Sequence, residues 1–331
     1  MSLHFPIAKF AAALGALSLL VSAQAQDAAT AYPGKPIRFV VPASAGGPSD
    51  VIARLVGERL STVLGQPVLV ENKPGASLML GTNEVAKAAG DGYTLLFTTS
   101  TPIVMIPATL KNVPYDPLRE LTTVAHLGST PLVLYVSSAV AAKNVKELAD
   151  LAKAKPGGLS YGSYGLGSSA HLLGEYMNKQ LGIKMIHAPY KGVAPQLQDL
   201  AGGQITAGVA DVGTASAFVK SGRIRPIAVT GTQRAKNLPD VPTFAEQGIV
   251  GMEPFSPWWG LFAPASTPRP VVDKLAAEIV KIVKSPDFAA RFIALGGDPT
   301  GLSSAEANEM TRTEVARWRS IVGSLGDLKF E

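Results

Sequence analysis

The chain contains no cysteine among its 331 residues, so disulfide bonds and thiolate chemistry are both unavailable to it. Charged residues make up only 17% of it, and the basic ones are scattered rather than clustered, which argues against a nucleic-acid partner. The four histidines are not spaced as metal ligands, and no HExxH motif is present. We therefore expect neither a metal nor a cofactor.

Long apolar runs are scarce too, and the one that stands out lies at the N-terminus. An apolar segment over 10–23 follows Lys9 and ends in Ala23-Gln24-Ala25, a small-x-small cleavage pattern. Its core is shorter than the ~20 residues that a membrane-spanning helix requires. The sequence predicts a signal peptide at residues 1–25 and an exported mature protein that is not embedded in a membrane.

The rest of the chain alternates between segments with strand and helix patterns. This alternation predicts an α/β fold with mainly parallel sheets, and about 300 residues suggest two domains. We predict a discontinuous first domain from 33–127 and 231–331, and a second domain from 128–230. Two domains joined by several chain crossings can close around a solute through a few backbone rotations.

A buried strand, a turn of small residues and an amphipathic helix follow one another between Val40 and Gly65. The turn Ala43-Ser44-Ala45-Gly46-Gly47 lets backbone N–H groups approach a ligand closely, and a helix start favours an anion. An ordinary connection between a strand and a helix is the alternative. Asp50 is expected to bond back to the helix N-terminus.

The same arrangement recurs between Leu159 and His171. Gly165 to Ala170 fits the G-x-G-x-x-A fingerprint of dinucleotide sites, but residues 185–187 supply no acidic side chain for a ribose. A small carboxylate at this helix start is therefore the better prediction. Tyr164 projects from the turn and could stack on a ligand, while His171 could donate to an anion or pack in the core.

Polar residues also follow two other predicted strands. Ser100 could cap a helix or bind a polar ligand, and Asp211 could bind a ligand or cap the next helix. Trp258 and Trp259 could line a cleft or belong to the core. No G-x-S-x-G elbow is present, but a secreted hydrolase that uses Ser168, His171 and Asp211 remains the rival hypothesis.

A series of motifs gives the chain a specific resemblance. PASAGGPSDVIARLVGERL, DGYTLLFTTS, YGSYGLGSSAHLLGE, HAPYKGVAPQLQDLAGGQI and WWGLFAPASTP occur in that order. They closely resemble the Bug-type (Bordetella uptake gene) receptors, the extracytoplasmic solute-binding components of tripartite tricarboxylate transporters. The resemblance covers nearly all of the mature chain.

The resemblance implies a periplasmic, type II-like Venus-flytrap protein with two domains. It implies binding of a small organic acid, delivery to the membrane components of the transporter, no catalysis and a monomeric state. A receptor that presents its loaded state to a membrane sensor is an alternative. Family members grip a ligand carboxylate between the first turn and the glycine-serine turn of the second domain. The matching positions here are Ser44, Ala45, Gly46, Gly47, Ser163, Ser168 and Ser169, with Ser100 and Asp211 as neighbours.

The chain departs from the family pattern at two positions near this site. Tyr164 stands where family members commonly have a small residue, and Ile106 stands where an asparagine is frequent. Both changes alter the predicted cleft, and Tyr164 makes an aromatic acid conceivable as the ligand.

Overall fold

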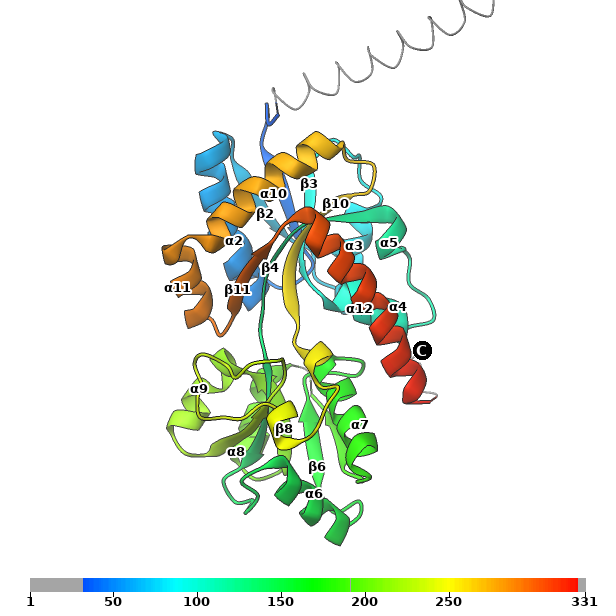
Figure 1. Cartoon of the computed structure of the whole chain (residues 1–331), viewed down its shortest axis with the longest axis vertical. Coiled ribbons are helices and arrows are strands. Elements are labelled where there is room, and N and C mark those ends of the chain that lie inside the picture. The colour runs from blue at the N-terminus through cyan, green and yellow to red at the C-terminus, as the bar shows by residue number, and fades with distance from the viewer. Residues whose placement is uncertain (1–31, 191, 327–331) are drawn as a thin grey trace, which may run out of the picture.

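The computed structural model describes residues 32–190 and 192–326, so the predicted signal peptide at 1–25 lies outside the described residues. Figure 1 shows two lobes, one above the other, that are joined by extended segments. Each lobe is built on its own β-sheet, and we call them the first lobe and the second lobe.

The first lobe contains a six-stranded sheet in the order β11-β4-β10-β3-β1-β2. Parallel pairing joins β1 to β2 and to β3, whereas β10 pairs antiparallel with both β3 and β4, and β11 pairs antiparallel with β4. The strands are β1 Ile37–Val41, β2 Val68–Asn72, β3 Thr94–Thr99, β4 Leu121–Ser129, β10 Trp258–Pro264 and β11 Asp298–Leu302.

Helices from both ends of the chain cover this sheet. The longer ones are α2 Pro48–Leu64, α3 Met79–Ala86, α10 Arg269–Lys284, α11 Pro286–Ala294 and α12 Ser304–Ser324, with the short α4 Ile106–Thr109 and α5 Pro117–Glu120 and the turns η1 Ala76–Leu78 and η2 Thr101–Met105. In α2 the buried side chains include Ile52, Val56 and Leu60, and the helix ends at Gly65 with φ +67°. The predicted apolar face of this helix is therefore confirmed.

The second lobe contains a five-stranded sheet in the order β7-β6-β8-β5-β9. Its elements are β5 Leu132–Ser137, β6 Ser160–Ser163, β7 Ile186–Pro189, β8 Ala207–Asp211, β9 Ile224–Val229, α6 Val145–Ala154, α7 Ser169–Leu181, α8 Val193–Ala201 and α9 Val212–Lys220. Leu134 and Val136 share a core cluster with residues of α6 and α7, while Val133 and Tyr135 share another with residues of α8 and α9. The two helix pairs therefore cover opposite faces of the sheet, since successive side chains of a strand point to opposite faces.

The α/β class and the two-domain periplasmic binding protein fold are confirmed, but the sheets are mixed rather than mainly parallel. The parallel pairs are β2-β1-β3 in one sheet and β7-β6-β8 in the other. Strands β5 and β10 each begin where the chain has just crossed between lobes, so they run opposite to their neighbours. The division at 127/128 and 230/231 stays a prediction.

Two connections join the lobes and lie side by side. The first, residues 130–131, links β4 to β5, and the second, residues 230–257, links β9 to β10 and contains η3 Ala245–Gln247 and η4 Glu253–Phe255. The Thr130 N–H donates to the Pro257 carbonyl at 2.8 Å. Thr230 Oγ1 accepts from the Leu132 N–H at 2.8 Å and lies 2.7 Å from Ser256 Oγ.

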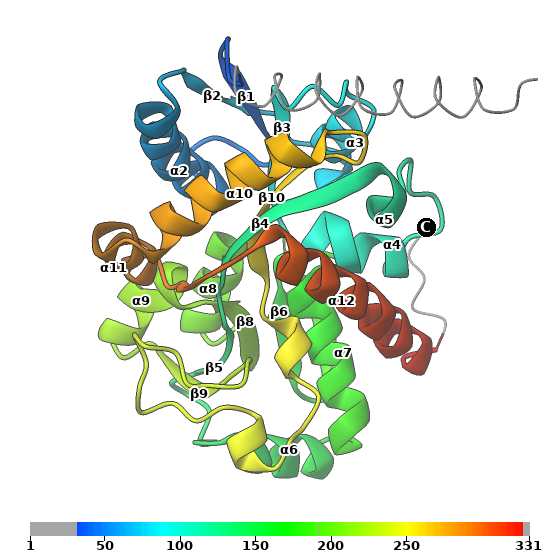
Figure 2. The ribbon, with the colours of Figure 1, turned by 45° about the horizontal axis from the view of Figure 1, so that its top comes forward.

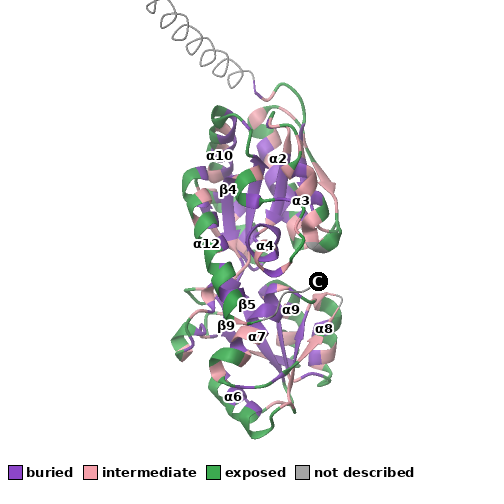
Figure 3. Ribbon diagram, turned by 90° about the vertical axis from the view of Figure 1, so that its right-hand side faces the viewer, coloured by how far each residue is buried: buried purple, intermediate pink, exposed green. Residues whose placement is uncertain are grey.

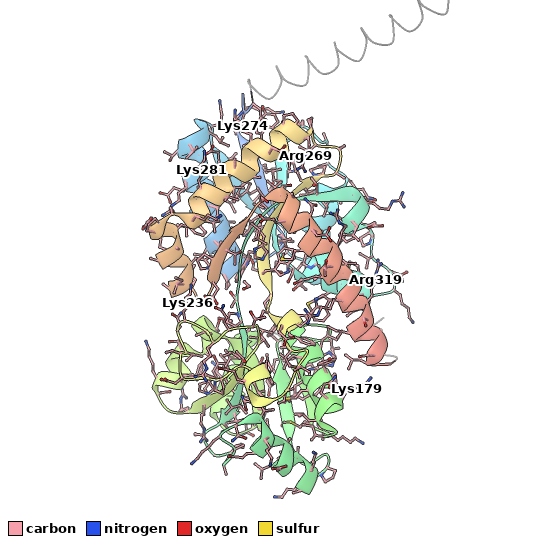
Figure 4. All side chains as sticks on the ribbon, viewed as in Figure 1. Lys179, Lys236, Arg269, Lys274, Lys281 and Arg319 are labelled. Atoms are coloured by element: carbon pink, nitrogen blue, oxygen red, sulfur yellow. The ribbon has the colours of Figure 1, made fainter. Side chains whose placement is uncertain are left out.

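Further contacts between the lobes lie on either flank of these connections. Phe255 packs between Trp318 of α12 and Tyr176 of α7, with ring centroids 5.1 and 5.5 Å away. Lys179 donates to the Ser324 carbonyl at the end of α12, and Lys236 pairs with Asp298 at 3.4 Å; Figure 4 shows these two lysines at opposite sides of the molecule. Figure 2 shows α12 reaching toward the second lobe. Figure 3 shows that the strands inside each lobe are buried.

Candidate functional site

The carboxyl ends of β1 and β3 lie at the edge of the first sheet that faces the second lobe. Because β1 and β3 are parallel, the residues that follow them emerge at the same edge. Ser100, directly after β3, donates its N–H to the Trp258 carbonyl at 2.8 Å, where the second connection enters β10. The turn after β1 therefore leaves the first lobe on its connection side.

The pairing in the second lobe brings its own turn to the corresponding edge. Leu132, the first residue after the first connection, pairs with Asp211 at the carboxyl end of β8. Strand β6 is parallel to β8, so Ser163 at its carboxyl end lies at the same edge. The two glycine-containing turns thus emerge from the sheet edges that meet at the connections. In Figure 1, strands β6 and β8 belong to the lower lobe and β10 to the upper lobe.

The turn after β1 is exposed over Ser44, Ala45 and Gly46, and Gly46 has φ +80°, which favours glycine. The Gly46 N–H donates to Asp50 Oδ2 at 2.9 Å. Arg54 pairs with the same carboxylate at 2.9 Å, and this partner, followed by the Gly46 N–H, lowers the pKa of Asp50. Asp50 therefore bonds back to the turn as predicted.

The first N–H groups of α2 have no acceptor within the helix, as at any helix start. Gly47 is the N-cap residue, and it has no side chain that could cap them. Pro48 occupies the first helical position, where it loses no hydrogen bond. This helix start thus combines backbone donors that no side chain caps with the positive end of a 17-residue helix.

Three serine hydroxyls predicted at the second turn all have partners inside the protein. Ser163 is fully buried, and its Oγ lies 2.7 Å from His187 Nε2. Ser168 caps α7: its Oγ accepts from the His171 N–H at 3.3 Å and donates to the Gly165 carbonyl at 2.7 Å. Ser169 Oγ bonds the Tyr164 hydroxyl. These hydroxyls hold the turn in shape. A ligand must therefore bind backbone donors, or it must displace the partners that these hydroxyls already have.

The turn itself projects one apolar side chain. Leu166 lies between Gly165 and Gly167, which have φ +149° and +69°, and it is 65% exposed. Tyr164 is half-buried, its pKa is raised to about 12 by burial, and the nearby charge of Asp211 adds to the shift. The structure therefore brings Tyr164, Ser169 and Asp211 into one neighbourhood at the start of α7.

An imidazole pair that sequence reasoning missed lies beneath this turn. The rings of His171 and His187 stack with their centroids 3.8 Å apart and their planes at 13°. Burial lowers the pKa of both to about 4, so both rings are neutral near pH 7. His171 lies on α7, whereas His187 lies on β7, so the two rings meet through a tertiary contact that leaves no local sequence signal.

The remaining predicted neighbours have structural roles. Asp211 caps α9, and its Oδ1 accepts from the Thr214 N–H at 2.8 Å. Ser100 is 3% exposed, and its Oγ accepts from the Trp258 N–H at 3.4 Å. Both tryptophans belong to the core: Trp258 donates to Glu314 at 2.7 Å and Trp259 to Ser49 at 3.0 Å.

The hydrogen bonds of Ser168, His171 and Asp211 are those of helix caps. Ser168 donates to a carbonyl, Asp211 accepts from Thr214, and His171 Nδ1 accepts from the Gly167 N–H at 3.1 Å. A nucleophile–base–acid relay needs a serine hydroxyl donating to an imidazole nitrogen. Here the Ser168 hydroxyl donates to the Gly165 carbonyl instead of to an imidazole nitrogen.

Over residues 32–190 and 192–326, no helix combines the length and the apolar character that crossing a membrane requires.

Comparison with known proteins places these features in a family. The model of the "Tripartite tricarboxylate transporter family receptor" matches residues 52–327. Protein BugT of Bordetella pertussis is 33% identical over 316 residues, covering 95% of this chain and 97% of BugT.

Solved structures agree with this assignment. The periplasmic binding protein BugD has a TM-score of 0.76 and 33% identity, covering 89% of this chain and 99% of BugD. A Rhodopseudomonas palustris protein, Rpa4515, was solved with adipate (TM-score 0.79, 31% identity, 89% and 98% coverage). MatC from the same organism was solved with malate (TM-score 0.75, 30% identity, 88% and 100% coverage). The chain therefore belongs to the tripartite tricarboxylate transporter receptor family, which includes periplasmic solute-binding proteins of the Bug type.

Proposed function

We propose that this protein captures a small carboxylate between the Ser44–Gly47 turn and the Ser163–Ser169 turn. The observation that carries the proposal is the placement of both turns at the sheet edges that meet at the connections. Ligands of open α/β sheets bind at the carboxyl ends of strands, and helix starts favour anions. Two relatives of similar fold were solved with the dicarboxylates adipate and malate, which favours the same ligand class here.

Neutral dipoles, rather than an ion pair, hold the anion in this proposal. The guanidinium of Arg54 is already paired with Asp50, and the side chains of the first turn carry no charge. Backbone N–H groups of Ala45 and of the first turn of α2 donate from one side, and the start of α7 faces the ligand from the other. Tyr164 and Leu166 then contact the carbon skeleton, and no chemistry takes place.

The binding experiment uses calorimetry with adipate, malate and a set of other mono- and dicarboxylates. Gly47→Val tests the first turn: Gly47 has φ −77° and ψ 168°, which valine adopts, and an added Cβ meets only Ser44 O at 3.4 Å. We expect the fold to survive and the affinity to fall about tenfold or more, because each factor of ten corresponds to about 1.4 kcal/mol.

Gly323→Val is the matched control, since a Cβ at Gly323 meets open space near the end of α12. A control with unchanged affinity and a weakened Gly47→Val supports the proposed turn. Equal affinity of the two variants for the acid contradicts the proposed turn. If no acid gives a heat of binding or raises the melting temperature, the proposed ligand class is wrong.

Delivery to the membrane components of a tripartite transporter is the second part of the proposal, and the family description supports it. Vesicles that contain such components are expected to accumulate labelled acid only when the loaded receptor is added. Binding without any stimulated uptake favours the alternative of a receptor that signals to a membrane sensor. Turnover of an ester substrate that is lost in Ser168→Ala supports the rival hydrolase instead.

A further inference from the structure

The two turns of the proposed carboxylate site offer different groups to a ligand. At the start of α2 no side chain caps the first N–H groups, because the N-cap residue is Gly47. At the start of α7, Ser168 Oγ accepts from the His171 N–H at 3.3 Å. The Tyr164 hydroxyl accepts from the Ala170 N–H of the same helix start. The helix start in the second lobe therefore already has acceptors from the protein itself.

The backbone of the second turn also has few donors to spare. Three further N–H groups have acceptors within the lobe: that of Gly165 donates to Ser163 Oγ at 3.3 Å, that of Gly167 to His171 Nδ1 at 3.1 Å and that of Ser168 to the Gly165 carbonyl at 3.3 Å. An anion at this turn would have to displace acceptors that are in place, and it would gain little from the exchange.

The second turn contributes apolar surface instead. Leu166 is 65% exposed, which makes it the most exposed leucine in the described part of the chain. One exposed leucine is ordinary on a protein surface, but the bonds on either side of this one fix its backbone in the turn. The ring of Tyr164 is half-buried beside it, with its hydroxyl bonded at the start of α7.

The charge at this edge opposes a second anionic group. Asp211 ends β8, and β8 is parallel to β6, so Asp211 and Ser163 lie at the same edge. The charge of Asp211 adds to the effect of burial in raising the pKa of Tyr164, and residues 163–171 contain no lysine or arginine. A ligand carboxylate at this edge would be repelled by Asp211. A ligand whose far end is apolar avoids this repulsion and covers Leu166.

We infer that the ligand is a monocarboxylate with an apolar body, whose carboxylate lies at the start of α2 and whose body lies against Leu166 and Tyr164. The inference rests on the proposed function and narrows it, because it assigns the anionic end of the ligand to the first lobe and the apolar end to the second. Each methylene group that becomes buried against Leu166 strengthens binding by up to about fourfold.

Three acids with the same six-carbon chain test the assignment by calorimetry near neutral pH. Hexanoate ends in a methyl group, adipate in a second carboxylate and 6-aminohexanoate in an ammonium group. Hexanoate is expected to bind at least about tenfold more tightly than adipate, because only adipate places a charge beside Asp211. It is also expected to bind more tightly than 6-aminohexanoate, whose ammonium group would lose water at an apolar surface.

Variants at this edge test the residues. Leu166→Ala is expected to weaken hexanoate about fivefold without lowering the melting temperature of the ligand-free protein. Asp211→Asn, which keeps a side chain that caps helices, is expected to strengthen adipate and leave hexanoate nearly unchanged. Leu118→Ala is the matched control: Leu118 is 41% exposed on α5, which precedes β4 and so lies at the end of the first sheet away from the second lobe.

The outcomes separate this inference from the proposed function. Tighter binding of adipate or 6-aminohexanoate than of hexanoate overturns the inference and leaves the proposed capture of a carboxylate standing. A preference for hexanoate that neither Leu166→Ala nor Asp211→Asn narrows also overturns it. If none of the three acids and none of the other carboxylates binds, the proposed function fails and the inference fails with it.

Discussion

At the scale of single residues, the stacked imidazoles beneath the second turn link stability to pH. In the folded protein the pKa values of His171 and His187 are about 4, whereas an unfolded histidine titrates near about 6.5. Between these values the unfolded chain binds more protons than the folded protein does. The contribution of the neutral pair to the free energy of unfolding is therefore fully present above about pH 6.5, and it is lost as the pH falls toward about 4.

His187→Gln tests this link. The variant keeps a polar side chain beside Ser163 Oγ, which now lies 2.7 Å from the imidazole, but it removes one proton-binding group. Urea denaturation of the wild type is expected to show stability falling between pH 7 and pH 4.5, and the variant is expected to show a shallower fall. If stability falls with pH equally in the wild type and in the variant, His187 does not contribute to the pH dependence of stability.

Local residue roles could be predicted from the sequence where the partner is close along the chain. Asp50 lies four residues from Gly46 and bonds it, as the helix-start pattern predicted. The hydroxyls of Ser163, Ser168 and Ser169 were predicted to face a ligand, but their bonds lie within the protein. The bond of Ser163 could not be predicted because its partner His187 comes from a neighbouring strand 24 residues away; a role of these serines in ligand binding stays a prediction.

At the scale of elements, the packing of α7 on β6 depends on a glycine in the middle of the helix. A Cβ built at Gly174 would lie 2.0 Å from Tyr161 Cε2 and 2.4 Å from Cζ. The ring cannot easily move, because it is fully buried and its hydroxyl donates to Glu175 at 2.6 Å. Helix propensity alone would favour alanine here by about 1 kcal/mol, so the sequence gives no hint of this close contact.

Gly174→Ala is therefore expected to destabilise the protein by about 1–3 kcal/mol, as overpacking of a close-packed core does. Urea denaturation monitored by circular dichroism measures the change. Gly323→Ala, where a Cβ meets open space inside α12, is expected to be neutral or slightly stabilising. A Gly174→Ala variant as stable as the wild type would show that Tyr161 can move aside.

Elements were predicted more reliably than their directions. Apolar spacing is a local property, and it placed α2 and the strand before it correctly. Strand direction depends on which neighbour a strand finds, and β5 and β10 start from connections between lobes, so their antiparallel pairing could not be derived from the alternation of patterns.

At the scale of the whole molecule, Thr230 joins the two connections at the point where they meet the second lobe. It is fully buried, and its Oγ1 accepts from the Leu132 N–H and lies 2.7 Å from Ser256 Oγ. Thr230→Val keeps the shape but leaves these groups without their partner. We expect a loss of about 1–3 kcal/mol in the free energy of unfolding.

Hydrogen exchange gives a second measurement of the same change. The Leu132 amide is expected to exchange faster in Thr230→Val, whereas Thr62→Val on the exposed face of α2 is expected to change stability by less than about 0.5 kcal/mol. Exchange at Leu132 that is as slow as in the wild type would show that the hydroxyl does not hold the two connections together.

The pairing of Thr130 with Pro257 has a mechanical consequence for the molecule. A lone segment between two bodies permits them to twist as well as to bend. Here two segments run side by side and are hydrogen-bonded to each other where they leave each lobe, which opposes twisting of one lobe against the other. The lobes are therefore expected to move by bending rather than by twisting.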